Sequence, residues 1–192
     1  FIAIFASGNG TNAQAIIDYF EDDELVKINR IYSNKSSANV LARAERHQIP
    51  TTVFNRQQFY DSDDVLKQLE ADKTDLIVLA GFMWLIPANI IRRYSGSIVN
   101  IHPALLPNFG GQGMYGDHVH EAVLREKEAL SGISIHLVNE QYDEGDIIFQ
   151  ATCPVFSEDT VDSLAQRIHS LEHQHYPEQI ALLTKSIKKG SK

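Results

Sequence analysis

Two side chains with catalytic chemistry stand close together in the segment Asn100–Pro107. Asn100 and His102 are at positions i and i+2, so on an extended segment both side chains point to the same face. An amide N–H donor beside an imidazole suits a reaction in which an oxyanion forms and a proton moves. The alternative is a structural pair bonded to loop backbone, although Pro103 and Pro107 stiffen the exit from this segment. We therefore take Asn100 and His102 as candidate catalytic residues.

An acidic segment supplies a third candidate. Asp143, Gly145 and Asp146 lie between two apolar runs, and Asp-x-Gly often forms only a tight turn. A carboxylate placed near His102 would instead raise the pKa of the imidazole and fix its tautomer. The residues alone allow both interpretations.

The glycine-rich segment Ser7–Asn12 has the composition of a phosphate-binding turn. Its glycines allow the backbone to come close to a ligand, and the helix predicted after them offers free N–H groups and a positive dipole end. Gly8-x-Gly10-x-x-Ala13 matches a relaxed dinucleotide fingerprint, but Tyr32–Lys35 lacks the acidic residue that would bind a ribose. The segment therefore favours a monophosphate over NAD, with a merely connecting turn as the alternative.

A histidine pair near the end of the chain resembles a zinc motif. His169, Glu172 and His173 fit the pattern H-x-x-E-H, with both imidazoles on one face of a predicted helix. A zinc hydrolase needs a further ligand, and Glu178 is the only candidate at a suitable distance along the chain. A solvated or half-buried helix face accounts for the same pattern, so we expect no metal.

Strand-length apolar runs alternate with helix-length amphipathic stretches, and these elements must position the candidates. The predicted strands are 2–6, 28–32, 51–54, 76–80, 98–101, 133–138 and 147–155. The predicted helices are 12–20, 38–47, 63–71, 88–94, 117–128, 159–172 and a last one that starts at Pro177. This order indicates an α/β, doubly wound, mostly parallel sheet with helices on both faces and possibly antiparallel late strands. Ligands bind such sheets at the carboxyl ends of the strands, where Ser7–Asn12 and Asn100 are expected.

The composition bounds the class of protein. With 192 residues, 43% apolar and 22% charged, we expect residues 1–192 to form one domain. The 17 basic and 25 acidic residues give a net charge of −8, which disfavours nucleic acid as a partner. Cys153 is the single cysteine, and no apolar run approaches the roughly 20 residues of a membrane span. We expect a cytoplasmic protein with no membrane or nucleic-acid partner.

Six short motifs, taken in order, resemble the phosphoribosylglycinamide formyltransferases, a family of folate-dependent enzymes. They are SGNGTN at 7–12, SNK at 33–35, LAGFM at 79–83, NIHPALLP at 100–107, D-x-G-x-I-I at 143–148 and EHQHYP at 172–177. Each motif alone is moderately specific. Together the motifs span nearly the whole chain, and their order and spacing are highly specific. The resemblance implies a Rossmann-like formyltransferase fold.

The resemblance also implies roles for individual residues. The catalytic trio would be Asn100, His102 and Asp143. The phosphate of the ribonucleotide would be held by Gly10, Thr11 and Asn12, with Glu172 as a further contact to this substrate. The pterin of 10-formyltetrahydrofolate would be lined by Met83, Trp84, Leu85, Ile86 and Asn100.

The implied reaction moves a formyl group from N10 of 10-formyltetrahydrofolate to the amine of phosphoribosylglycinamide, a step of de novo purine biosynthesis. Asn100 and a protonated His102 would stabilise the oxyanion, while Asp143 would orient His102 and help relay a proton to the leaving nitrogen. Both substrates are small molecules, and this chemistry requires no metal. The sequence is compatible with a monomer and with a homodimer.

Three other functions share parts of this pattern. A 10-formyltetrahydrofolate hydrolase is similar around the trio but usually has a second histidine after the first, where this chain has Pro103. A methionyl-tRNA formyltransferase adds a nucleic-acid-binding module, which the net charge disfavours. A non-catalytic nucleotide-binding protein on the same scaffold would bind phosphate at residues 8–12 without turnover.

Three features depart from the family pattern. Phe109–Gly116 is longer and richer in glycine than expected, which suggests a mobile lid or an oligomer contact. Trp84 replaces a residue that is often arginine. No arginine occurs between Phe59 and Asp63, where some relatives use one to meet the folate tail.

Overall fold

The computed structural model describes the backbone of residues 1–190 and the side chains of residues 1–187. Within them, seven strands form one sheet with the order β3-β2-β1-β4-β5-β6-β7. The strands are β1 (Ile2–Phe5), β2 (Ile28–Ser33), β3 (Thr51–Val53), β4 (Leu76–Leu79), β5 (Ile98–His102), β6 (Leu130–Leu137) and β7 (Ile147–Pro154). The helices are α1 (Thr11–Tyr19), α2 (Asn39–Arg46), α3 (Arg56–Tyr60), α4 (Asp64–Ala71), α5 (Ala88–Arg93), α6 (Asp117–Arg125) and α7 (Val161–Gly190).

The sheet is parallel from β3 to β5 and antiparallel from β5 to β7. This confirms the predicted α/β architecture, including its antiparallel late strands. No helix in residues 1–190 combines the length and apolarity needed to cross a membrane.

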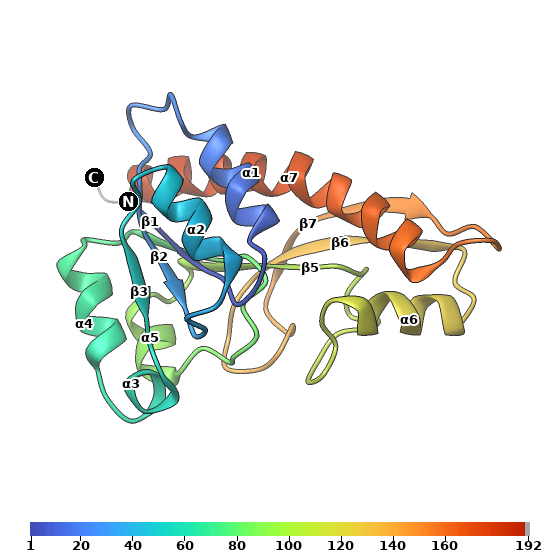
Figure 1. Cartoon of the computed structure of the whole chain (residues 1–192), viewed down its shortest axis with the longest axis horizontal. Coiled ribbons are helices and arrows are strands. Elements are labelled where there is room, and N and C mark those ends of the chain that lie inside the picture. The colour runs from blue at the N-terminus through green and yellow to red at the C-terminus, as the bar shows by residue number, and fades with distance from the viewer. Residues whose placement is uncertain (191–192) are drawn as a thin grey trace.

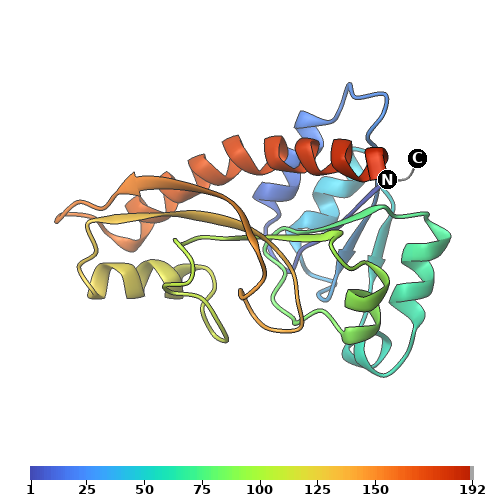
Figure 2. The ribbon, with the colours of Figure 1, turned by 180° about the vertical axis from the view of Figure 1, so that it is seen from behind.

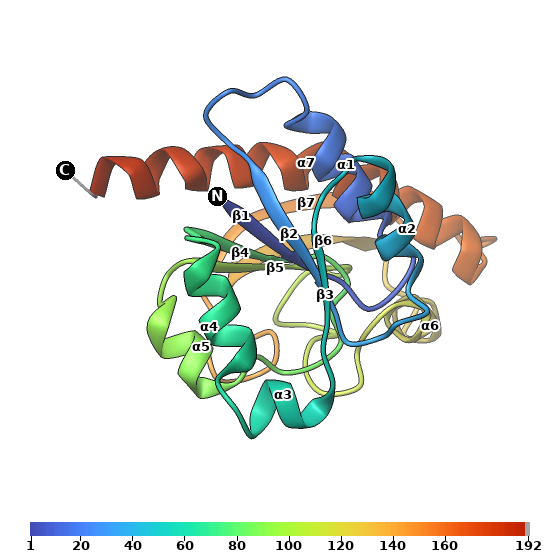
Figure 3. The same cartoon turned by 60° about the vertical axis from the view of Figure 1, so that its left-hand side comes forward.

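Helices cover both faces of the sheet (Figures 1 and 3). α1, α2 and α7 lie on one face, and α3, α4 and α5 lie on the other. Because side chains alternate along a strand, Ile2 and Ile4 of β1 enter the first layer while Ala3 and Phe5 enter the second. Seen from behind, α7 runs along the sheet beside the long β6–β7 hairpin (Figure 2). A central strand such as β1 is therefore apolar at every position because helices cover both faces of the sheet.

The structure differs from the predicted elements in three places. α7 runs without a break through Pro177, so the prediction that one helix ends near residue 172 and another starts at Pro177 is wrong. The neighbouring Tyr176 is fully buried, and its hydroxyl donates to the carbonyls of Leu79 and Val99, so tertiary packing offsets the backbone hydrogen bond that proline cannot make. In addition, α3 (Arg56–Tyr60) was not predicted, and β6 begins three residues earlier than expected.

Candidate active site

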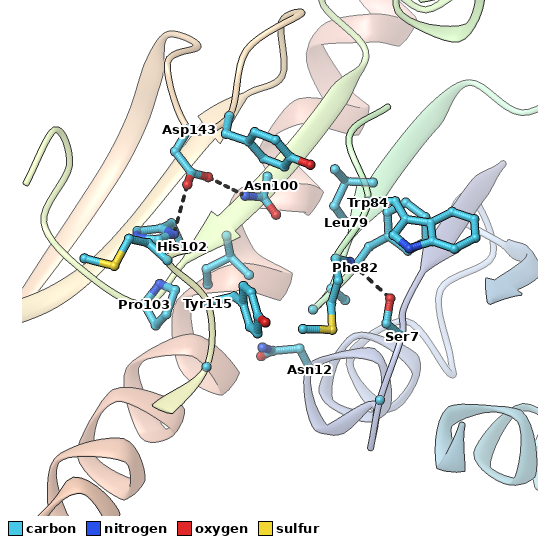
Figure 4. Close-up of a pocket in the computed structure, with 18 of the residues that line it drawn as sticks. Ser7, Asn12, Leu79, Phe82, Trp84, Asn100, His102, Pro103, Tyr115 and Asp143 are labelled. Carbon is cyan, nitrogen blue, oxygen red and sulfur yellow. Dashed lines mark hydrogen bonds and ion pairs between the residues drawn. The ribbon is translucent and has the colours of Figure 1, made fainter. Parts of the chain in front are cut away.

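The carboxyl ends of β1, β4 and β5 open into one cavity of about 680 Å³ (Figure 4). This volume lies within the usual range for small-molecule sites. Every residue predicted for the site lines the cavity, namely Gly10, Thr11, Asn12, Met83, Trp84, Leu85, Ile86, Asn100, His102, Asp143 and Glu172. The structure thus brings together segments that are up to 162 positions apart in the sequence.

His102 is the last residue of β5 and is 3% exposed. Its Nε2 lies 2.7 Å from the carbonyl oxygen of Phe109, and because a carbonyl only accepts, Nε2 carries a hydrogen. Its Nδ1 lies 3.5 Å from Oδ2 of Asp143. Burial lowers the pKa of His102, while the Asp143 carboxylate and the Phe109 carbonyl act against it. The expected contact with Asp143 is present and its carboxylate acts to raise the pKa as expected, but burial has the larger effect, so the pKa of His102 is lowered.

Asp143 lies in the loop between β6 and β7, with a left-handed φ of 55°. The N–H of Gly111 donates to its Oδ2 at 3.0 Å. Burial raises the pKa of Asp143, but the imidazoles of His136 and His102 and the N–H of Gly111 together outweigh burial, so the pKa is lowered. The carboxylate is therefore charged at neutral pH. The acidic segment forms a turn and also reaches His102, so both interpretations of it hold.

Asn100 is fixed by the neighbouring antiparallel strand. Its Cα is paired with that of His136 across β5 and β6. The amide Nδ2 lies 3.1 Å from Nε2 of His136 and 3.4 Å from Oδ1 of Asp143. The close-up shows the amide nitrogen turned toward Asp143 (Figure 4). The role of Asn100 as a donor to an oxyanion stays a prediction.

The glycine-rich loop Phe109–Gly116 forms one wall of the cavity and contacts His102 and Asp143. The Phe109 carbonyl contacts His102 and the Gly111 N–H contacts Asp143. Gly111, Gly113 and Gly116 all have positive φ values, which glycine adopts without strain. These glycines thus let the loop turn sharply along the wall of the cavity.

The predicted phosphate turn lies at the start of α1. Gly10 has a φ of 74°, and a Cβ added there would overlap Val40, so glycine is required on two counts. No side chain caps α1, which leaves its first N–H groups available to an anion. Asn12 Nδ2 donates to Glu172 Oε2 at 2.9 Å. Glu172 is 6% exposed, and burial raises the pKa of its carboxyl.

Two residues of the zinc-like pattern, His169 and Glu172, line the cavity near the start of α1. The rings of His169 and His173 stack with centroids 6.2 Å apart, whereas Glu172 is turned to Asn12. In residues 1–190, with side chains described to residue 187, no group of three histidine, cysteine or acidic side chains is arranged to hold a metal ion.

The opposite end of the cavity is apolar. Trp84 belongs to an aromatic cluster that also contains Phe54, Phe59, Tyr60 and Phe82. The N–H of Met83 donates to Oγ of Ser7 at 3.1 Å, and the Tyr60 hydroxyl donates to the carbonyl of Leu85 at 2.9 Å. These bonds fix the segment that was predicted to line a pterin.

α3 also brings a cation to this end. The guanidinium of Arg56 lies over the rings of Tyr60 and Trp84, 5.2 and 5.5 Å from their centroids. Although no arginine occurs between Phe59 and Asp63, Arg56 therefore places a positive charge beside Trp84.

The sequence model of the formyl transferase family matches residues 1–180. The chain belongs to the formyl transferase family. It is 38% identical over 181 residues to a phosphoribosylglycinamide formyltransferase of Haemophilus influenzae, covering 92% of this chain and 83% of that protein. A protein of the same name from Bacillus subtilis is 35% identical and is covered to 97% of its length. The crystal structure of glycinamide ribonucleotide transformylase 1 from Symbiobacterium toebii superposes with a TM-score of 0.88 at 33% identity, covering 96% and 87% of the two chains.

Some relatives of this formyl transferase are far longer. The trifunctional purine biosynthetic protein adenosine-3 of Drosophila melanogaster is 38% identical over 190 residues, but the chain spans only 14% of its length. The match covers 60% of the Vigna unguiculata protein named phosphoribosylglycinamide formyltransferase, chloroplastic.

Several lining residues of the formyl transferase site were not predicted. They include His136, His120, Lys35, Met114 and Tyr115. Lys35 had a signal in the SNK motif, because a cation near a phosphate turn is chemically meaningful. His136 had none, since its approach to Asn100 depends on the register of two antiparallel strands.

Proposed function

We propose that this formyl transferase moves the formyl group of 10-formyltetrahydrofolate to the amine of 5'-phosphoribosylglycinamide. The products are formylglycinamide ribonucleotide and tetrahydrofolate, as in de novo purine biosynthesis. The observation that carries this proposal is one cavity with an anion-binding helix end, a central Asn–His–Asp group and an apolar end. The names of the bacterial relatives support the same substrates.

The substrates would lie along the cavity in a fixed order. The phosphate would accept hydrogen bonds from Gly10, Thr11 and Asn12 at the start of α1. Glu172 would contact the ribonucleotide. The pterin would lie against Met83, Trp84, Leu85 and Ile86, with Arg56 at the rim for a tail carboxylate. This order places the amine and the formyl carbon near Asn100, His102 and Asp143.

The chemistry is an attack of the neutral amine on the formyl carbon. A C–N bond forms, a tetrahedral oxyanion develops, and the bond to N10 breaks as N10 takes up the proton that the amine loses. His102 and Asp143 would hold and transfer this proton, which is typically worth about 10²–10⁴-fold in rate. Donors to the oxyanion are worth roughly 3–4 kcal/mol each. The burial of His102 away from water strengthens such interactions.

We also propose the cytoplasm as the location of this reaction. The single thiol, Cys153, is buried and requires no oxidising compartment.

A spectrophotometric assay of folate deformylation, with and without the ribonucleotide, tests the proposal. Deformylation that depends on the ribonucleotide amine supports a transferase. Equal rates in both reactions would instead identify a hydrolase. No deformylation in either reaction, together with ribonucleotide binding by calorimetry, would identify a non-catalytic binding protein.

A further inference from the structure

Arg56 is an exposed cation beside the apolar end of the cavity. Its guanidinium lies over the rings of Tyr60 and Trp84, and no acidic side chain among residues 1–187 forms an ion pair with it. By contrast, Arg30 and Arg167 each pair with a carboxylate of the protein. The charge and the N–H donors of Arg56 are therefore available to a ligand.

The backbone that carries Arg56 is held in place from both sides. The N–H of Gln58 donates to Oδ1 of Asn55, and the N–H of Asn55 donates to Oε1 of Gln58, both at 2.9 Å. Phe59 is 1% exposed and belongs to the same hydrophobic layer as Phe5 of β1. This capping box and this buried ring fix the short helix α3 against the sheet. Arg56 thus has a defined position relative to the cavity, although its side chain is exposed.

Trp84 connects this cation to the cavity. The indole is half-buried and lines the cavity, and the central carbon of the Arg56 guanidinium lies 5.5 Å from its ring centroid. Figure 4 shows the indole on the side of the cavity away from His102 and Asp143. A guanidinium that contacts rings through its face keeps the N–H groups at its edge, and a carboxylate accepts from that edge in a bidentate manner. A ligand that extends from the reacting centre past Trp84 would therefore meet a carboxylate-binding group.

We infer that Arg56 and Trp84 form one unit that selects folates by a carboxylate of their glutamate tail, with the indole holding the guanidinium in place. The inference rests on the proposed function, because it takes a folate as the ligand of this end of the cavity. It makes Arg56 a specificity-determining residue and Trp84 its positioning residue. The tail carboxylates of a folate lie beyond its aromatic part, so they reach the rim while the pterin stays near the reacting centre.

Calorimetric binding of two ligands tests the role of Arg56. The ligands are tetrahydrofolate and its diamide, in which neutral amides replace both tail carboxylates. We expect the wild-type protein to bind tetrahydrofolate about tenfold more tightly than the diamide, because a charge-assisted bond is lost with the carboxylate. In Arg56→Gln the ratio of the two Kd values should fall to about two or less, with the Kd of the diamide unchanged. Equal Kd values for both ligands in the wild-type protein would overturn the inference.

The same ratio tests the role of Trp84, since it cancels any apolar contact that both ligands lose equally. Trp84→Leu removes the aromatic face and should lower the ratio to about three or less. Trp84→Phe keeps an aromatic face and should retain most of the wild-type ratio. A Trp84→Leu variant with the full wild-type ratio would contradict the positioning role of the indole. Circular dichroism of each variant shows whether it folds.

Arg46→Gln is the matched control, because it removes a positive charge from an exposed position on α2, on the other face of the sheet. It should keep the wild-type ratio, and a fall as large as that of Arg56→Gln would overturn the inference. Trp84 is the only tryptophan of the chain, so a change in its fluorescence reports ligand binding at this rim independently of turnover.

The two ligands also separate failure of this inference from failure of the proposed function. A wild-type protein that transfers the formyl group but binds both ligands equally well contradicts the inference alone. A protein that binds neither ligand contradicts the proposed function and the inference together.

Discussion

His102 is the residue whose chemistry can be tested most simply. It combines 3% exposure with a carboxylate 3.5 Å from Nδ1 and a carbonyl acceptor at Nε2. We expect His102→Ala to lower kcat by about 10²–10⁴-fold, because proton transfer and charge stabilisation are both lost. Steady-state kinetics measure this loss. His118→Ala, at a side chain on α6 that is 60% exposed, is the matched control and should behave as wild type. A fully active His102→Ala would refute the assignment.

Glu172 makes the stability of the protein depend on pH. Burial raises the pKa of Glu172 in the folded state above its ordinary value, so the folded protein binds this proton more tightly than the unfolded chain does. Stability is then greatest below the unfolded pKa and falls as pH rises toward the folded pKa, by at most about 1.4 kcal/mol per pH unit. Urea unfolding at a series of pH values measures this slope.

Glu172→Gln should remove that slope, since glutamine has no proton to lose and can still accept from Asn12. We expect the variant to gain stability relative to wild type as pH rises above about 5. The same slope in both proteins would show that another group is responsible.

The placement of single residues at the cavity was largely predictable, whereas their environment was not. Spacing alone placed Asn100 and His102 on one face of a strand. The net effect on the His102 pKa depends on how much water the fold excludes, and the bond from Asn100 to His136 depends on strand register. Neither the exclusion of water nor the register of the strands can be read from the residues adjacent in sequence.

At the scale of elements, the β6–β7 hairpin holds Asp143 against the sheet. A Cβ added to Gly145 would overlap the carbonyl of Leu137, so Gly145→Ala must move the loop that carries Asp143. We expect a loss of kcat of about tenfold or more, because a misplacement of about 1 Å at a reacting group can cost 10²-fold. Glu144→Ala, at an exposed neighbouring position, is the control. Equal activity of both variants would mean that the loop tolerates the shift.

Periodicity predicted most elements within a few residues, and its failures have physical reasons. Pro177 is a strong local signal for a helix boundary, yet α7 continues because Tyr176 and Ile180 are buried against the sheet. α3 is only one turn long and begins with an Asn55–Gln58 capping box, which is too short for a periodic pattern to show. Local sequence signals fail where tertiary contacts determine the structure or where an element is too short to show a period.

At the scale of the whole molecule, we propose that the chain unfolds as one unit. The two hydrophobic layers pack on opposite faces of a single sheet and share its strands. Unfolding of one layer therefore disrupts the sheet on which the other layer packs. Differential scanning calorimetry should give one transition whose calorimetric and van't Hoff enthalpies agree. Two separate transitions would contradict the expectation of one domain over residues 1–192.

The identity of the formyl acceptor is the central claim, and isotopic labelling tests it most directly. Folate carrying a carbon-13 formyl group is incubated with the enzyme and phosphoribosylglycinamide, and the products are followed by carbon-13 resonance. We expect the label to appear as a formamide on the ribonucleotide while tetrahydrofolate accumulates. Label released as free formate, or label that never leaves the folate, would contradict the account.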